Sequence, residues 1–466
     1  MLFNSFTFLF LFLPIVLGVA LRLKGRWIIR WLTCASFFFY SLVGQAWFVI
    51  PMVATTVIDF QVGRMIARSR KKSRRRLLLA TSLIGNLGML AYFKYSALFL
   101  SSARHGLEAL GIAHGTGDWG TLLLVALPPG ISFYTFQTMS YIIDVYRGDA
   151  RCENDFWRFA GFVSFFPHLV AGPLTRHHQL IPGLTRMQNK GIKPRWSEGI
   201  LLFSMGLCKK VLIADRIAKL IDPQIAQPQN MGFAIAWLSI LGFALQIYFD
   251  FSGYSDMAIG LGRLYGIELP QNFNSPYRAL NPSDFWRRWH ITLSSWLRDY
   301  LYISLGGNQC SKLRRHLNLM ITMLLGGLWH GANWTFAAWG FYHGLLLIIY
   351  DLMRKQWDGW HPSFQRALTF FSVCIGWVFF RANDFSTVKI WLTQALVPDA
   401  NFTALLASEL IPLLSLGFLI TQLFPNASSS PRFARLSPLL QIGMGGATVV
   451  ALLFMNYSSR FLYFQF

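Results

Sequence analysis

The chain has 466 residues, of which 54% are hydrophobic and only 13% are charged. Soluble globular proteins carry about 25% charged residues, so this deficit, with a mean hydropathy of +0.41, excludes an ordinary soluble protein. The net charge of +22 does not indicate nucleic-acid binding, because the lysines and arginines form short clusters between apolar segments. Such clusters are typical of the loops that orient a membrane protein.

The first predicted span, residues 1–23, contains an apolar run from Phe8 to Val19, and the positive charges come after this run, at Arg22, Lys24 and Arg26. This order is the reverse of a cleavable signal peptide, so we expect a first transmembrane helix that starts outside. A hairpin of two spans, the second of which is the segment 47–66, separates this basic loop from a second one at residues 67–76. Basic loops favour the cytoplasm, so both loops are predicted to be cytoplasmic.

Spans 77–100 and 122–143 follow, the second of them interrupted by Pro128, Pro129 and Gly130. Residues 156–174 contain two prolines and are predicted to be re-entrant, because breaks inside a span free backbone groups that need other partners. Spans at 200–214 and 231–249 precede residues 272–303, which are too polar to cross and which we expect to line an inner vestibule.

The remaining predicted elements are the apolar stretch 318–350, spans at 368–380, 405–424 and 439–455, and an amphipathic segment at 384–396. The fold class is therefore an all-α polytopic membrane protein with roughly ten to twelve spanning or half-spanning helices. We expect one membrane domain over residues 1–466. The five cysteines are scattered without a C-x-x-C pair, so neither a disulfide framework nor a metal site is predicted.

The stretch 318–350 carries Gly326, Gly327 and Gly331 around His330. Each glycine weakens a helix by roughly 1 kcal/mol relative to alanine and lets backbone or substrate come close. An ionisable side chain at membrane depth is costly and points to a functional site. The alternative is a histidine that only hydrogen-bonds a neighbouring helix, as His343 in the same stretch would.

A second polar stretch, residues 286–300, combines tryptophans, arginines and His290. If it is one helix, Trp286, His290, Leu293 and Leu297 share a face. Such a segment could hold a pantetheine thioester, with Arg287 and Arg288 on the phosphates and the indoles along the acyl arm. The alternative is an interfacial helix with tryptophans at the headgroup level and arginines reaching to water.

The dipeptide Trp-His occurs at 289–290 and again at 329–330, and a third copy at 360–361 lies in a polar loop. A neutral imidazole can act as a general base at physiological pH. Without a metal, its natural task is to take a proton from a hydroxyl that attacks an activated carbonyl. No G-x-S-x-G elbow is present, so a serine hydrolase is not predicted.

Polar residues also gather between Gln246 and Asp256, with Asp250 among them, and Asp144 could join them. These residues could hold cations, form a proton path or orient a histidine. The alternative is that they satisfy freed backbone groups and neighbouring arginines near the inner face.

Several motifs together resemble the membrane-bound O-acyltransferase family, and in particular its bacterial alginate O-acetyltransferase branch. They cover the chain nearly end to end and in order. They are MLFNSF (1–6), LFLFLP (9–14), PGISFY (129–134), FPHLVAGP (166–173), QIYFDFSGYSD (246–256), DFWRRWH (284–290), LWHG (328–331) and GWVFFR (376–381).

The resemblance implies a ring of transmembrane helices around a thinned centre, where funnels from both faces meet at a histidine. By this resemblance His330 matches the catalytic histidine, and His290 matches a second position that is histidine or asparagine. The predicted substrate-binding residues are Trp289, Arg287, Arg288, Trp329 and Asn333.

The implied activity is acetyl transfer across the inner membrane of a Gram-negative bacterium. The donor is acetyl-CoA or an acyl-carrier thioester on the cytoplasmic side, and no tightly bound cofactor is expected. The acceptor is a periplasmic partner acetyltransferase that modifies an exopolysaccharide, with alginate first and peptidoglycan or cellulose as alternatives. Membrane lipids are the other expected partners.

Two other function classes remain open at this stage. A proton-coupled transporter could use the same buried histidines and aspartates as a relay, although no internal inverted repeat is visible. A non-catalytic scaffold of a polysaccharide export complex is the second.

Overall fold

The computed structural model describes residues 1–111, 126–398, 404–424, 438–457 and 461–462, and in these ranges the regular elements are all helices. Five described helical stretches are long and apolar enough to cross a membrane, and three shorter apolar helices accompany them. The five are Ala46–Arg68, Lys72–Ala109, Phe233–Leu264, Trp334–Leu352 and Pro362–Arg381. The prediction of an all-α polytopic membrane protein is therefore confirmed.

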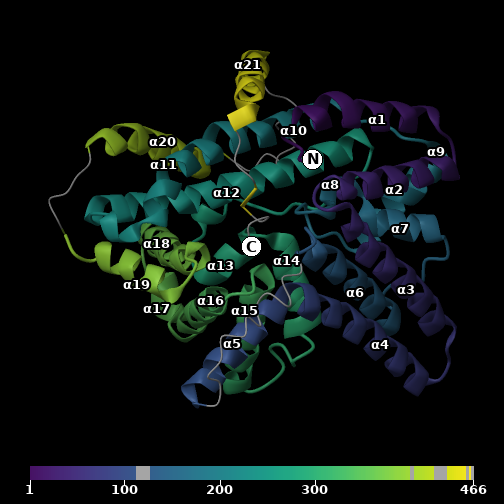
Figure 1. Cartoon of the computed structure of the whole chain (residues 1–466), viewed down its shortest axis with the longest axis horizontal. Coiled ribbons are helices and arrows are strands. Elements are labelled where there is room, and N and C mark those ends of the chain that lie inside the picture. Colours follow the sequence, from purple (N-terminus) through teal and green to yellow (C-terminus); the bar gives the residue numbers. More distant parts are fainter. Residues whose placement is uncertain (112–125, 399–403, 425–437, 458–460, 463–466) are drawn as a thin grey trace. The chain divides into compact units, whose positions relative to one another are not determined.

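The chain divides into two compact units, each described here by itself (Figure 1). Unit 1 comprises Met1–Leu2, Phe6–Lys193 and Tyr265–Leu269, and unit 2 comprises Phe3–Ser5, Pro194–Leu264 and Pro270–Phe466. The prediction of one domain over residues 1–466 stays a prediction, as does the number of full spans.

The α-helices of unit 1 lie between residues 13 and 190. They are α1 (Leu13–Arg22), α2 (Arg26–Ser41), α3 (Val49–Arg68), α4 (Lys72–Leu90), α5 (Ser96–Ala109), α6 (Ile131–Arg147), α7 (Phe156–Ser164), α8 (Phe166–Leu169) and α9 (His177–Lys190). Part of the span predicted at 122–143, residues 122–125, lies outside the described residues. The predicted re-entrant segment 156–174 is broken at Phe165 into α7 and α8.

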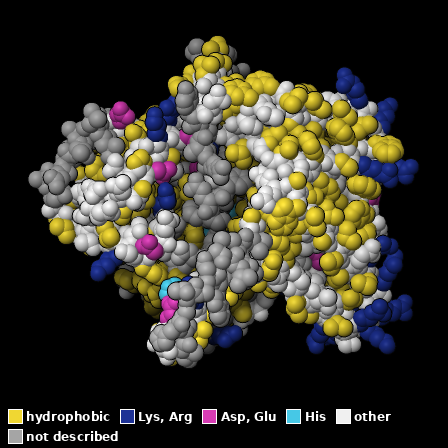
Figure 2. All heavy atoms as spheres, viewed as in Figure 1, with side chains coloured by type: hydrophobic (Ala, Val, Ile, Leu, Met, Phe, Trp, Pro, Cys, Tyr) yellow, Lys and Arg dark blue, Asp and Glu magenta, His cyan; other side chains and the backbone are white. Residues whose placement is uncertain are grey.

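The surface of unit 1 separates apolar from basic side chains. In α4, Leu77, Ile84 and Leu87 are exposed, and only 17% of the apolar window in Lys72–Ala109 is buried. Lys and Arg gather at one margin of this unit in Figure 2, and the segments 22–26 and 68–76 expose all of their basic residues except the half-buried Arg75. Apolar flanks with basic ends are what lipid contact requires.

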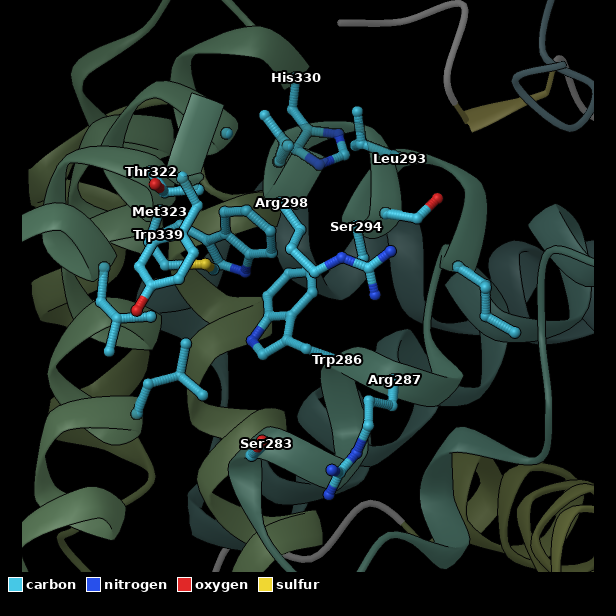
Figure 3. A pocket seen from close by; sticks show the side chains of 17 residues that line it. Ser283, Trp286, Arg287, Leu293, Ser294, Arg298, Thr322, Met323, His330 and Trp339 are labelled. Carbon is cyan, nitrogen blue, oxygen red and sulfur yellow. The ribbon is translucent and has the colours of Figure 1, made fainter. Parts of the chain in front are cut away.

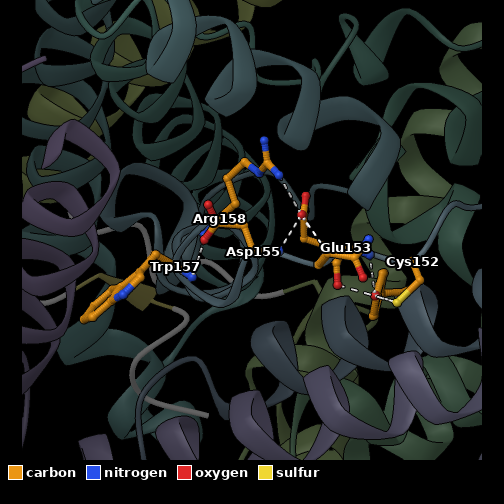
Figure 4. A network of polar contacts seen from close by, with 7 residues as sticks. Cys152, Glu153, Asp155, Trp157 and Arg158 are labelled. Atoms are coloured by element: carbon orange, nitrogen blue, oxygen red, sulfur yellow. Dashed lines mark hydrogen bonds and ion pairs between the residues drawn. The ribbon is translucent and has the colours of Figure 1, made fainter. Parts of the chain in front are cut away.

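The loop between α6 and α7 is held by a polar network (Figure 4). The Glu153 carboxylate accepts hydrogen bonds from the backbone N–H of Asn154 at 2.8 Å and of Asp155 at 2.9 Å, and it pairs with Arg158 at 2.9 Å. Asp155 in turn accepts from the N–H of Trp157 at 2.9 Å as the N-cap of α7. The network satisfies backbone donors that would otherwise be unpaired at a helix start.

Unit 2 contains the two histidines singled out from the sequence. Its helices are α10 (Trp196–Cys208), α11 (Asp215–Ala226), α12 (Phe233–Leu264), α13 (Pro282–Arg288), α14 (Ile291–Trp296), α15 (Lys312–His330), α16 (Trp334–Leu352), α17 (Arg354–Gly359), α18 (Pro362–Arg381), α19 (Phe385–Gln394), α20 (Ala404–Leu423) and α21 (Pro438–Phe454). Two π-helical segments, Lys209–Ala214 and Leu297–Tyr302, continue α10 and α14.

Helix α12 is the most buried span of this unit, with 72% of its apolar window covered. It continues to Leu264, fifteen residues past the predicted end at 249, because the polar residues of its second half are paired inside the protein. Asp256 forms an ion pair with Lys209 at 2.6 Å, and Asp250 forms one with Lys210 at 2.6 Å. The partners of these aspartates are thus lysines rather than the arginines considered from the sequence.

Candidate active site

His330 lies at the tip of a helical hairpin. The stretch 318–350 does not form one continuous helix, because α15 ends at His330 and α16 runs back from Trp334. Gly327 and Gly340 permit this, since a Cβ at Gly327 would collide with the carbonyl oxygen of Phe336 and a Cβ at Gly340 with that of Met323. The glycines therefore act through close helix packing, which places the histidine at a chain reversal.

Asn333 holds the reversal in place. Its side chain accepts a hydrogen bond from the N–H of Thr335 at 3.1 Å as the N-cap of α16, and it donates to the carbonyl of Asn383 at 2.6 Å. An N-cap of this type stabilises a helix by about 1 kcal/mol. Asn333 thus fixes the loop beside His330, and its predicted contact with substrate stays a prediction.

Aromatic rings enclose the imidazole of His330, which is only 6% exposed. The ring centroids of Trp329, Trp339 and Phe380 lie at 5.0, 5.1 and 5.2 Å from it, all at steep angles. Such a cage limits rotation of the imidazole and removes water from its sides. A proton acceptor in this setting is well oriented and poorly hydrated, as general base catalysis favours.

A cavity of about 310 Å³ reaches His330. Its walls come from α13, α14, the π-helical segment after α14, α15 and α16, and they are mostly apolar. In Figure 3, His330 and Ser283 lie at opposite ends of the lining, with Trp286 and Arg298 between them and Arg287 near the Ser283 end. Both arginines are exposed residues. Apolar walls with a few placed polar groups are typical of a site that binds a small organic molecule.

The backbone around His290 differs from the prediction. Residues 286–300 are not one helix, because α13 ends at Arg288, Trp289 is extended and His290 is left-handed with φ 43° and ψ 53°. The shared helix face of Trp286 and His290 was therefore a wrong prediction. The helix is interrupted because this backbone forms hydrogen bonds with residues 272–274. In one of them, the N–H of Ile291 donates to the carbonyl of Asn272 at 2.9 Å.

Asn272 fixes the side chain of His290 as well. Its Oδ1 lies 3.0 Å from Nδ1 of His290 and accepts from the hydroxyl of Thr292 at 2.8 Å. Its amide donates to the hydroxyl of Ser255 at 3.2 Å. His290 is 1% exposed, and this burial lowers its pKa to about 3. Its ring is therefore neutral at physiological pH.

The two histidines are neighbours with different surroundings. Their ring centroids are 6.4 Å apart, and the ring of Trp329 lies close to both, at 5.9 Å from His290 and 5.0 Å from His330. His330 lines the cavity, whereas His290 and Trp329 stand outside its lining. The two Trp-His dipeptides, which are 40 residues apart in the sequence, thus lie side by side, and the roles of these residues stay predictions.

The DFWRRWH motif contains three predicted substrate-binding residues, and the structure places them in different surroundings. Arg287 lines the cavity. Arg288 instead pairs with Asp284 at 2.9 Å and donates to the carbonyl of Asn274 at 3.3 Å. Trp289 is 1% exposed and packs between the rings of Phe285 and Trp377, with centroids at 5.7 and 4.8 Å.

Four residues outside the predicted set complete the site. Trp286 and Arg298 line the cavity, and both belong to the aromatic and cationic segment that the sequence had marked. Asn272 positions His290, but no local pattern identified it, because its partners lie 18 and 20 residues away. Trp339 both encloses His330 and lines the cavity.

Comparison with known proteins decides the family. The profile of the membrane-bound O-acyltransferase family matches residues 154–383, which include both histidines. A probable alginate O-acetylase, AlgI, of Pseudomonas aeruginosa is 43% identical over 82% of this chain and 72% of its own length. The chain belongs to the membrane-bound O-acyltransferase family.

Two other relatives are also transferases, and their names give different polymers. A peptidoglycan O-acetyltransferase of Helicobacter pylori is 37% identical over 84% of this chain and 79% of its own length. A teichoic acid D-alanyltransferase of Bacillus subtilis is 28% identical over 55% of this chain and 69% of its own length. This membrane-bound O-acyltransferase is therefore an acyl-transferring enzyme and a multi-pass membrane protein, as predicted.

Proposed function

We propose that this O-acyltransferase moves an acetyl group from a cytoplasmic thioester to a periplasmic acceptor, for the O-acetylation of an exopolysaccharide, with alginate as the first candidate. The observation that carries the proposal is the cavity that ends at the caged imidazole of His330. The setting we propose is the family's ring of helices around a thinned centre, in the inner membrane of a Gram-negative bacterium.

The chemical step needs one base and one leaving group. His330 takes the proton of an acceptor hydroxyl while the hydroxyl oxygen attacks the carbonyl carbon of the thioester. The new C–O bond forms, the C–S bond breaks, and the departing thiolate takes the proton from the imidazolium. The proton and the acetyl group are both accounted for, and no further reactant is needed.

The cavity suits a thioester with a phosphorylated arm. Arg287 and Arg298 are exposed and line the cavity, and guanidinium groups bind phosphate oxygens well. Trp286 and Trp339 offer apolar walls for the arm between the phosphates and His330. Acetyl-CoA and an acyl-carrier thioester share this chemistry, and both remain candidate donors.

The alternative acceptors share the same transfer step. The relatives named as alginate O-acetylases support alginate, and the peptidoglycan O-acetyltransferase supports peptidoglycan as the second candidate. Cellulose is the third. In each case we propose that a periplasmic partner acetyltransferase receives the acetyl group and passes it to the polymer.

The test of the activity uses the purified full-length chain in lipid nanodiscs with acetyl-labelled CoA. We expect the label to leave the donor and to appear on the partner acetyltransferase when both proteins are present. A chain that neither consumes the donor nor passes on the label would be a scaffold. A chain that moves protons or ions in liposomes without consuming the donor would be a transporter.

The test of the acceptor uses a strain that lacks this gene. We expect the acetyl content of its alginate to fall to background by NMR, while the muropeptides and the cellulose keep theirs. Loss of acetyl groups from muropeptides or cellulose alone, with alginate unchanged, would assign the enzyme to the alternative polymer.

A further inference from the structure

A second cavity, separate from the one at His330, lies in unit 2 between α12, α18 and α20. Its volume is about 620 Å³, twice that of the first. Apolar side chains form most of its wall, among them Leu241, Leu245, Phe370 and Leu414. All of its lining differs from that of the first cavity, so the acetyl-transfer reaction proposed above makes no use of it.

One cation lines this apolar cavity. Arg366 stands in the second turn of α18, and its Nε is buried without a hydrogen-bond partner. Within the described ranges, no ion pair with a carboxylate is formed by Arg366. Arg366 as a whole is half-buried, but a guanidinium nitrogen that is buried against apolar walls without a hydrogen-bond partner is costly unless an anion accepts from it. The guanidinium therefore favours a ligand with a negative group.

The polar and apolar residues of the lining are arranged as an amphipathic ligand would require, with the polar residues at one end. On α18, Ser363 and Arg366 come first and Phe370 and Phe371 follow. On α20, Gln422 ends the lining, and Ile411 lies about 16 Å away along the helix axis, at 1.5 Å per residue. The apolar part is thus long enough for much of an acyl chain.

The outer rim of this cavity is apolar and exposed. Phe371, Ile411 and Phe418 are each at least 40% exposed. The ring centroids of Phe370 and Phe418 are 5.5 Å apart, and those of Tyr277 and Phe370 are 5.2 Å apart. These packed rings close one side of the cavity. Of the helices that carry this rim, α18 is long and apolar enough to span a membrane, and α20 contains a shorter apolar helix, Glu409–Leu423. An exposed apolar rim on such helices is suited to contact with hydrocarbon rather than with water.

We propose that this cavity is a binding site for one anionic phospholipid, with an acyl chain between α12, α18 and α20 and the phosphate on Arg366. Basic pockets between transmembrane helices bind anionic lipid head groups in this way. The charge of Arg366 selects an anionic lipid over a zwitterionic one. A hydrophobic helix of another protein would cover the apolar rim but would leave the guanidinium without an anion, so the lipid accounts for more of the observations.

The test uses the full-length chain, stripped of lipid in detergent and titrated with phosphatidylglycerol in native mass spectrometry. Phosphatidylcholine and inorganic phosphate are titrated in parallel. The variants are Arg366→Gln, which removes the charge, and Leu241→Trp, which fills the apolar wall. Arg354→Gln is the matched control, because Arg354 is 70% exposed on α17 and outside the cavity.

We expect Arg366→Gln to weaken phosphatidylglycerol binding about tenfold, because a charge-assisted hydrogen bond to the phosphate is lost. Phosphatidylcholine binding should weaken less, because the choline cation already offsets the charge of its phosphate. Leu241→Trp should weaken binding of both lipids, and Arg354→Gln of neither. Acetyl transfer by each variant, measured with the labelled donor, reports that the chain is folded.

Three results would overturn the proposal. Equal binding of phosphatidylglycerol by the wild type and both cavity variants would show that the lipid binds elsewhere. Competition by inorganic phosphate at the same concentration as the lipid would assign the site to a soluble anion. Loss of a co-purifying membrane protein in Leu241→Trp, with lipid binding unchanged, would make the cavity a protein interface.

Discussion

The two Trp-His dipeptides of unit 2 have the same sequence and opposite local structures. His330 is the last residue of α15, in a right-handed helix that ends at a hairpin tip. His290 is a left-handed residue between two short helices, held by Asn272. Only the first of these imidazoles lines the cavity. The Trp-His dipeptide therefore identifies candidate residues. Whether each histidine lines the cavity depends on the backbone conformation at the helix end where it lies.

The largest expected effect separates His330 from a third Trp-His histidine. His330→Ala should lower acetyl transfer by about 10²- to 10⁴-fold, because it removes the general base. The control is His361→Ala, since His361 is exposed, caps α18 and is not among the residues that line the first cavity. The measurement is the initial rate of label transfer from the donor. Similar rates for the two variants would contradict the assignment of His330 as the general base.

The second effect tests the support of His290. Asn272→Ala should lower the free energy of unfolding by roughly 1–3 kcal/mol, because it removes the hydrogen bonds that Asn272 makes with the buried His290 and Thr292. We expect kcat to fall while the KM for the donor changes little, since Asn272 is outside the cavity lining. Thermal unfolding and steady-state kinetics measure the two parts. A raised KM with unchanged kcat would place Asn272 in donor binding instead.

A third and smaller effect is expected from His290→Asn. Asparagine tolerates the left-handed conformation and keeps a polar side chain, so the loss of activity should stay within about tenfold. Because burial lowers the pKa of His290 to about 3, its ring stays uncharged until the pH falls to that value. The activity–pH curve between about pH 5 and 9 should therefore keep its shape in this variant. A shifted acid limb would show that His290 titrates during turnover.

The smallest effect distinguishes the two neighbouring arginines. Arg287→Gln should raise the KM for the donor by a few-fold to about tenfold, because Arg287 lines the cavity at an exposed position where water screens its charge. Arg288→Gln should act less on KM and more on stability, because it breaks the pair with Asp284. Donor titrations and thermal unfolding of both variants measure this. A larger KM change in Arg288→Gln would reverse the assignment.

Much of this site could be predicted from the sequence, and the failures have identifiable causes. His330, Arg287 and the polar character of 272–303 follow from residue types and hydropathy. The break at His290 does not, because it depends on a backbone pairing with residues 272–274 that lie well before it in the chain. The hairpin at His330 needed the packing of Gly327 against α16. The length of α12 was underestimated because its aspartates are paired with Lys209 and Lys210 from another element.

The central claim is that the caged imidazole at the end of the first cavity performs the proton transfer. The most direct measurement is a single-turnover experiment on purified His330→Ala with labelled donor, run beside a donor-binding titration. The account predicts a donor Kd within a few-fold of the wild type and no transfer of label on the time scale of many wild-type turnovers. Transfer at the wild-type rate by this variant would contradict it.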